Sequence, residues 1–492
     1  MTLDNFELIY SRNRCEIKNK PRVISKLKDI LGEQNVSTKR VDLLAYSGDT
    51  TLIGTNWMLK GKIAGLPDII TWPENVKQIS EILKLANEEK IPVIPRGEGS
   101  GVVGGAITIY GGIVIDMKKF NRIIEINDED LTITVETGIN GMNLERYLNA
   151  KGYTMGHIPQ SLYTSSLGGW IAHRAAGQFS TKYGKIEDMI LGMEIVLPQG
   201  EIISIKPIAG ASRGPLLEKL FIGSEGTLGI VTKATLKIWP YPEKRSLISY
   251  AFPTIEDSFN AIRETLRENV YPAVIRIYDD QETDRHFEFI KEAKGKVMVV
   301  FICEGNKDLV SLEEKITREK CQKYNGVDCG EKPVEHWLET RFKVTETSST
   351  PTFKIVFDTI EVASLWSNAS RIYHSVLKAM KNLKGVLLIT AHVSHFYPNG
   401  VGIYFTFAGV PPKGISDFDF YKMCWNTTMK TVIENGGIIG HHHGVGINRS
   451  AWMEDEWGNA LNLLRDIKKL LDPNNILNPG KLYQPIWSKV IE

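Results

Sequence analysis

Residues 95–105 read PRGEGSGVVGG, directly after the apolar stretch IPVI, and this glycine-rich loop is the first clue to the fold. Residues without a Cβ let backbone amides converge on an anion, so the loop is suited to a pyrophosphate. It is neither the dinucleotide fingerprint nor a P-loop, because AITIYGGIVIDM predicts a strand rather than a helix and no GK[ST] is present. A mobile surface turn is the alternative, so other segments have to decide between the two.

The elements around this loop follow the order of an α/β unit. PDIITWP at 67–73 predicts a strand, NVKQISEILKLANEEK at 75–90 an amphipathic helix, and GGIVIDM at 111–117 another strand. Residues 121–141 then alternate apolar and polar side chains at period two, as half-buried strands do.

A change in the pattern of predicted helices and strands near residue 242 predicts a second domain. WPYPE at 239–243 ends the first one, and after it helix-like and strand-like stretches alternate continuously. A chain of 492 residues is also too long for one core. The expected organisation is an N-terminal helical segment at 1–62, a first domain at 63–242, an α+β cap domain at 243–430, and a C-terminal segment at 431–492 that returns to the binding site.

Composition narrows the class of protein. The 59 basic and 58 acidic residues give no reason to expect nucleic acid as a partner. Five cysteines without CxxC spacing argue against a disulfide framework. No signal-like h-region or membrane-length apolar run is present, so we expect a cytoplasmic protein. A homodimer is the expected assembly, and the 1–62 segment leaves peripheral membrane contact open.

Two further segments share the small-residue character of the first loop. Residues 156–201 hold SLYTSSLGGWIAHRAAG, and residues 221–238 read FIGSEGTLGIVTKATLKI. Small residues allow a flat ring system to lie against the backbone. Because each of the three segments is tied to a strand, we expect them to form one binding surface.

Together these motifs resemble the FAD-binding domain of the vanillyl-alcohol oxidase (PCMH-type) superfamily: PxGxGSG, PxSxxxSSLGGWIxxRAxG with YGxIED, GSEGTLGIVT, and the ending LDPNNILNPGKLY at 471–483. The resemblance implies an α+β fold with a two-part PCMH-type FAD-binding domain and an α+β cap. Since the first loop offers only Glu98 and Ser100 where relatives attach the flavin, non-covalent FAD is expected. The resemblance places near FAD the residues Pro95, Arg96, Gly97, Glu98, Gly99, Ser100, Gly101, Gln160, Ser161, Ser165, Ser166, Gly169, His173, Arg174, Ala175, Glu225, Gly226, Thr227, Gly229, Ile230 and Val231.

The run GHHHGVG at 440–446 is internal, so it is not an affinity tag. D-lactate and 2-hydroxyglutarate dehydrogenases of the superfamily usually have a metal-chelating Glu-His-Gly turn there, whereas this chain has Gly440 and His441 in place of the glutamate. Adjacent residues on an extended strand point to opposite faces, which leaves only His441 and His443 on one side. His392 and His395 would have to complete a site, and we expect no metal.

HHHGVG and GIYFTF at 402–407 instead resemble the alkylglycerone-phosphate synthases. The resemblance implies exchange of the acyl group of acyl-dihydroxyacetone phosphate for a fatty alcohol through a flavin N5 adduct. Tyr404 would be the acid/base, with its pKa lowered by nearby cations, and Asp358 and Trp366 lie near a further subfamily motif. The remaining expected catalytic residues are His441, His442 and His443, and the expected substrate-binding residues are Arg341, Arg276 and His392.

Other interpretations remain open at this point. The same residues suit an FAD-linked 2-hydroxy-acid dehydrogenase or oxidase of the D-lactate or glycolate type, in which Arg341 holds the carboxylate. Without any resemblance, Tyr404 is a core tyrosine, Arg341 a surface charge beside Glu339, and Arg276 a structural ion-pair partner. A flavin-binding carrier or light-sensing module is the non-enzymatic alternative.

Overall fold

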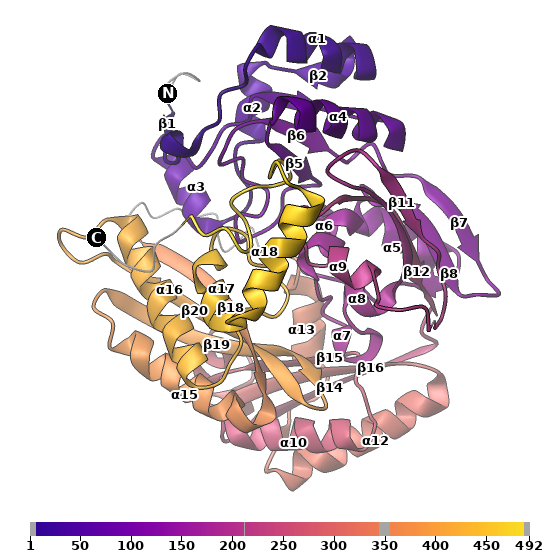
Figure 1. Cartoon of the computed structure of the whole chain (residues 1–492). Coiled ribbons are helices and arrows are strands. Elements are labelled where there is room, and N and C mark those ends of the chain that lie inside the picture. The colour runs from indigo at the N-terminus through magenta and orange to yellow at the C-terminus, as the bar shows by residue number, and fades with distance from the viewer. Residues whose placement is uncertain (1–5, 211, 344–354, 487–492) are drawn as a thin grey trace.

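The structure, a computed structural model, describes residues 6–210, 212–343 and 355–486. Three sheets of four or more strands organise the described part of the chain (Figure 1), in addition to two two-stranded sheets. The first has the order β2-β4-β6-β5, with parallel pairing of β4, β6 and β5 as the α/β pattern predicted. Its strands and main helices are β2 (Val36–Ser37), β4 (Ile69–Thr71), β6 (Ile113–Asp116), β5 (Val93–Arg96), α1 (Lys20–Leu31) and α4 (Val76–Glu89).

The second sheet is antiparallel and has the order β11-β10-β12-β8-β7. Two of the predicted small-residue segments are attached to it, because α6 precedes β10 and the GSEGTLG turn leads into β12. The elements are β7 (Ile123–Asn127), β8 (Thr132–Glu136), α5 (Gly141–Ala150), α6 (Leu167–His173), α7 (Ser180–Tyr183), α8 (Ile186–Met189), β10 (Ile190–Val196), β11 (Ile202–Ile205), α9 (Glu218–Phe221) and β12 (Ile230–Lys237).

The third sheet forms the cap domain, with seven antiparallel strands in the order β17-β14-β16-β15-β19-β20-β18. Its strands are β14 (Lys244–Phe252), β15 (Val274–Tyr278), β16 (Val297–Gly305), β17 (Val327–Asp328), β18 (Val356–Leu365), β19 (Val386–Tyr397) and β20 (Gly400–Gly409). Its helices are α10 (Ile255–Arg267), α11 (Asp280–His286), α12 (Lys307–Lys323), α13 (Lys332–Thr340), α15 (Trp366–Lys381) and α16 (Asp417–Glu434).

Alternation along the cap strands creates two different faces. On β16, Val299 and Phe301 pack into one core with α10 and α15, whereas Val300 and Ile302 pack into a second core with residues of the first domain. We call the face toward the first domain the inner face. A polar side chain on the inner face of a cap strand therefore lies between the two domains.

The two ends of the chain both reach the first domain. The N-terminal segment holds α2 (Arg40–Ala45) and α3 (Leu52–Leu59), and in addition to the predicted helices it supplies β2 to the first sheet. The C-terminal α17 (Met453–Trp457) and α18 (Ala460–Leu471) are yellow in Figure 1. After α18, Leu477 bridges Val93 of β5. The predicted α+β class with a two-part first domain and a cap is confirmed.

Candidate active site

Tyr404 lies on the inner face of the cap sheet. Its neighbours on β20, Ile403 and Phe405, point into the core that the cap sheet forms with α10 and α15, which we call the outer core. Because side chains alternate along a strand, Tyr404 points toward the first domain. Its side chain is 7% exposed. Directly across the ladders lie Glu361 on β18 and His392 on β19. A carboxylate, a phenol and an imidazole therefore lie side by side on three neighbouring strands.

Arg276 and His392 belong to the same face. Arg276 is paired with Ser394 across β15 and β19, and its Nη1 donates to Ser394 Oγ at 3.2 Å. The His392 ring stacks on Tyr404 with 4.4 Å between centroids, and its Nδ1 lies 3.4 Å from Oε1 of Glu282. Two of the three predicted substrate-binding residues thus meet at Tyr404.

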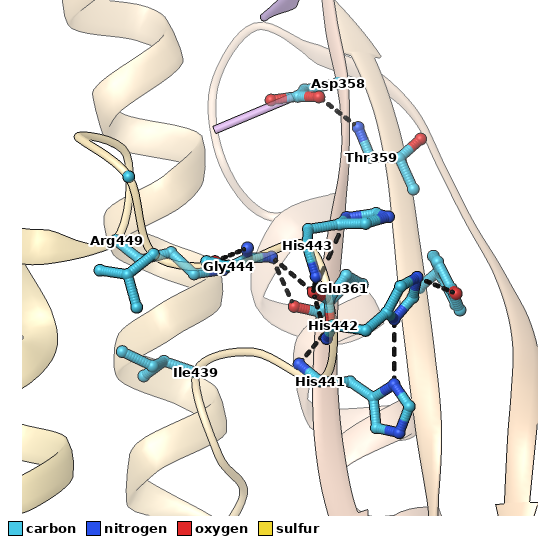
Figure 2. Close-up of polar contacts among 12 residues, drawn as sticks. Asp358, Thr359, Glu361, Ile439, His441, His442, His443, Gly444 and Arg449 are labelled. Atoms are coloured by element: carbon cyan, nitrogen blue, oxygen red, sulfur yellow. Dashed lines mark hydrogen bonds and ion pairs between the residues drawn. The ribbon is translucent and has the colours of Figure 1, made fainter. Parts of the chain in front are cut away.

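The histidine run is a bend held by Glu361, as Figure 2 shows. This fully buried carboxylate accepts the backbone N–H groups of His441 (2.5 Å), His442 (3.1 Å) and His443 (2.8 Å). The buried Arg449 lies 3.3 Å from the same carboxylate. Burial alone would raise the pKa of Glu361, but Arg449, His443 and His441 lower it to about 2.

The prediction that adjacent histidines face opposite sides is wrong. Because the run bends instead of extending, Nδ1 of His441 and Nδ1 of His442 lie 2.9 Å apart, and the rings of His442 and His443 stand 4.4 Å apart (Figure 2). By distance, His395, His441 and His442 could hold a metal, since their ligand atoms lie within 4.8 Å of one another. The absence of a metal stays a prediction.

Tyr404 hydrogen-bonds two of these imidazoles. Its Oη lies 2.8 Å from His395 Nε2 and 3.2 Å from His442 Nε2. Burial raises the pKa of Tyr404 well above its ordinary value, and the Glu361 charge adds to this rise. The predicted lowering by cations is therefore wrong, because the influence of Arg276 is smaller than the effect of burial.

Burial also keeps the histidines neutral. It lowers the pKa of His441 to about 3 and that of His443 to about 4, and it lowers the pKa of His395 and His442 well below the ordinary range. Neutral imidazoles can each donate one proton and accept another. Near neutral pH these rings can therefore exchange protons with neighbouring groups.

The predicted cofactor segments converge in the first domain. A Cβ added at Gly97 would lie 2.1 Å from Ser166 Oγ, and one at Gly226 would lie 2.4 Å from Pro95. Within the first loop, a Cβ on Gly99 would meet the Arg96 guanidinium at 2.2 Å. Close backbone approach thus explains the glycines, and the three segments form one cradle that fits an extended cofactor such as FAD.

His173 marks the place where this cradle meets the histidine bend. Cβ atoms added at Gly105 or Gly444 would lie 2.6 and 2.5 Å from its ring. Its Nδ1 contacts Gly169 O, while its Nε2 is buried without a hydrogen-bond partner. Glu225 of the third segment connects the cradle to the chain after the bend, because its carboxylate accepts the backbone N–H of Val445 at 2.5 Å. A polar atom of a bound ring system would satisfy His173 Nε2.

Several other predicted cofactor residues make contacts within the protein, and their contact with FAD stays a prediction. The Arg174 side chain is 55% exposed and pairs with Glu187 at 2.7 Å. Ser165 accepts from the Trp170 indole, and Thr227 accepts from the Tyr483 hydroxyl. Of the remaining predicted cofactor residues, Gly229 and Ile230 are buried, Gln160 is exposed, and the half-buried ones are Glu98, Ser100, Gly101, Ser161, Gly169, Ala175 and Val231.

Among the described residues, Arg341 makes no hydrogen bond to Tyr404 or to the histidines. It donates to Gln178 Oε1 at 3.2 Å and stands over the rings of Phe179, Trp337 and Phe342. Burial lowers its pKa to about 10, and within the described ranges it forms no ion pair with a carboxylate. A guanidinium without a carboxylate partner has the chemistry to bind an anion.

Sequence reasoning missed the contribution of the N-terminal segment. Thr50 donates to the carbonyls of Ser100 (2.7 Å) and Gly101 (2.9 Å), which fixes SGDTT against the first loop. Asp49 Oδ2 is buried without a partner and would lie 3.9 Å from a Cβ on Gly101. It also missed Glu361, because nothing in the local sequence distinguishes this residue from other strand residues, and it considered His395 only as a metal ligand and not as a partner of Tyr404.

Comparisons with known proteins place the chain in a family. Residues 67–206 match an FAD binding domain and residues 241–482 match the C-terminal domain of FAD linked oxidases. The chain is 32% identical to the uncharacterized FAD-linked oxidoreductase YgcU of Escherichia coli, over 94% of this chain and 98% of that one. It is 30% identical to the alkyldihydroxyacetonephosphate synthase of Trypanosoma brucei brucei, over 91% and 79% respectively. A solved alkyldihydroxyacetonephosphate synthase shares the fold, with a TM-score of 0.81, 24% identity and coverage of 97% and 87%.

Proposed function

Because the chain belongs to the FAD-linked oxidases, we propose that it is an FAD-dependent enzyme of the alkylglycerone-phosphate synthase type. Its substrate is an acyl-dihydroxyacetone phosphate, and a fatty alcohol replaces the acyl group. Bound FAD supplies the electrophilic ring that this exchange requires. The chain's own residues bind the anionic substrate and move its proton.

The position of Tyr404 carries this proposal. Its hydroxyl lies within hydrogen-bond distance of two neutral imidazoles, His395 and His442, on the face of the cap that meets the FAD domain. A phenol held in this way can release a proton to a carbon atom and take one back. Hydride removal alone requires a single base and no such pair of partners.

Two guanidinium groups are available for the substrate's negative charges. Arg276, on the same face as Tyr404, has its Nε buried and unpaired. Arg341 is likewise without an acidic partner among the described residues. We assign the phosphate to Arg276 with the histidines and the departing carboxylate to Arg341, since bidentate forks suit both anions.

FAD is expected to bind without a covalent bond. The first loop offers Glu98 and Ser100, and neither side chain forms the histidine link found in some relatives. Acid precipitation should therefore release all of the flavin into the supernatant. Yellow colour that stays with the precipitate would contradict this point.

A 2-hydroxy-acid dehydrogenase or oxidase is the second candidate, and one observation favours it. His392 is oriented by Glu282 and stacks against Tyr404, which is the arrangement expected of a base that removes a hydroxyl proton. In that case Arg341 or Arg276 holds the substrate carboxylate.

One experiment separates the two candidates. The FAD-loaded protein is mixed anaerobically with acyl-dihydroxyacetone phosphate and a fatty alcohol, and in parallel with D-lactate and with glycolate. The synthase proposal expects release of fatty acid and formation of the ether product without lasting bleaching of the flavin. Bleaching by a hydroxy acid, with no ether product in the first mixture, would overturn it in favour of the dehydrogenase.

A further inference from the structure

A β-bulge places His395 in the site. The ladder between β19 and β20 shifts register between Ser394 and Phe396. Regular alternation would turn His395 toward the outer core, as Val393 is. Instead, His395 adopts φ +59° and is buried beside Tyr404. Phe396 takes the position in the outer core. A left-handed conformation disfavours any residue except glycine, so the fold sustains strain to aim this ring at the phenol.

His395 belongs to a continuous chain of six hydrogen-bonding groups. Ser180 Oγ lies 2.7 Å from His395 Nδ1, and His395 Nε2 lies 2.8 Å from Tyr404 Oη. On the other side, Tyr404 Oη lies 3.2 Å from His442 Nε2. His442 Nδ1 then meets His441 Nδ1 at 2.9 Å, and His441 Nε2 meets the Tyr397 hydroxyl at 2.9 Å. Both nitrogens of all three rings are engaged.

The number of protons limits how this chain can be arranged. Three hydroxyls and three neutral imidazoles carry six transferable protons, and the chain has five bonds. If both ends donate inward, Ser180 donates to His395 and Tyr397 donates to His441. His441 then donates to His442, and His395 and His442 both donate to Tyr404. All five bonds are satisfied, and the Tyr404 proton is the one left over.

Building on the proposed acid/base role of Tyr404, we propose that His395 and His442 both donate Nε2–H to its oxygen, so that its own proton points to the substrate. Ser180 and Tyr397 are positioning residues that fix the tautomers. When the Tyr404 O–H bond breaks, its proton forms a C–H bond with the electron pair of an enolate carbon of the substrate, and the O–H electron pair stays on the phenolate oxygen. The two N–H donors stabilise that phenolate until it takes a proton from a substrate C–H bond, which restores the phenol and leaves the electron pair of that bond on carbon.

A competing arrangement is available to the same groups. Ser180 also contacts Tyr397, so a sixth bond can close the chain into a ring in which every group donates in one direction. Tyr404 would then donate to one histidine and keep no proton for the substrate. In such a ring, either His395 or His442 carries its proton on Nδ1.

The tautomers can be measured directly. Long-range ¹H–¹⁵N spectra are recorded without substrate on the FAD-loaded, EDTA-treated protein labelled with ¹⁵N-histidine. The signals of each ring are assigned by their disappearance in the variants H395Q, H441Q and H442Q. The expected pattern is Nε2–H for His395 and His442 and Nδ1–H for His441. An Nδ1–H tautomer at His395 or His442, or a metal-shifted pattern before EDTA treatment, would overturn the inference.

Tyr397→Phe supplies a second measurement that leaves every histidine in place. Without the Tyr397 donor, nothing holds the His441 proton on Nδ1, so the Nδ1–H fraction of His441 and the Nε2–H fraction of His442 should both fall, and kcat should fall by on the order of tenfold with KM unchanged. Tyr271→Phe is the matched control, since the Tyr271 hydroxyl donates to Asn269 and makes no other hydrogen bond among the described residues. A purely structural Tyr397 would lower stability without moving the His442 tautomer. Because the spectra need no substrate, failure of the proposed reaction and failure of this inference are distinguishable.

Discussion

Glu361 and Tyr404 face each other directly across strands β18 and β20. One carboxylate therefore holds the backbone of the three histidines and stands beside the proposed acid/base. Its charge contributes to the raised pKa of Tyr404. The bend and the tyrosine consequently respond together to any change at residue 361.

Glu361→Gln should destabilise the protein by about 3–5 kcal/mol, because it leaves Arg449 buried with no charged partner. Urea unfolding of the two proteins measures the difference. Glu454→Gln is the control, since its pair with Arg465 is exposed and should change stability by less than about 1 kcal/mol. Equal midpoints for Glu361→Gln and the control would show that the carboxylate does not hold the bend.

Tyr404→Phe should keep FAD and the fold while reducing turnover by roughly 10²–10⁴-fold, the usual worth of a positioned acid/base. Steady-state kinetics and the flavin absorption spectrum are the two measurements. Tyr153→Phe, at an exposed hydroxyl on the first domain, controls for the loss of a phenol. Full turnover in Tyr404→Phe would remove the tyrosine from the mechanism.

Arg276→Met and Arg341→Met should each raise the KM of an anionic substrate by about tenfold or more, because each removes a charged hydrogen-bond donor. Arg371→Met, which removes an exposed guanidinium on α15, should leave KM unchanged. If Arg341 is only a structural residue held by Phe179 and Trp337, its variant will lose stability with no change in KM.

Acid should destabilise the protein through the buried histidines. His441 and His443 have folded-state pKa values of about 3 and 4 because burial disfavours their charged forms, whereas the unfolded value is about 6.5. The unfolded state therefore binds protons first, and stability is lost as the pH falls from about 6.5 toward 4. The free energy of unfolding of His443→Gln should fall less steeply than that of the parent protein over this range, and identical slopes would contradict the assignment.

Most of the α/β unit and the cap strands that carry Arg276 and Tyr404 could be predicted, because these features depend on local periodicity. Tyr404 and Arg276 could be identified on their strands, yet the face they occupy became clear only with the strand order and register. Glu361 was missed for the same reason, since VFDTIEV reads as an ordinary half-buried strand.

Three features depended on tertiary structure that no local pattern encodes. The bulge at His395 reverses the alternation that sequence reasoning assumes. The histidine run bends because a carboxylate some 80 residues earlier accepts its amides. The Tyr404 pKa is raised because burial outweighs a nearby arginine, a balance that residue types alone do not reveal.

A crystal structure of the FAD-loaded protein tests the central claim most directly. The account predicts that the isoalloxazine ring lies beside His173 and the bend at 441–444, with one face toward the Tyr404 hydroxyl and a polar ring atom bonded to His173 Nε2. A ring bound elsewhere, or protein atoms filling the space between it and Tyr404, would contradict the account.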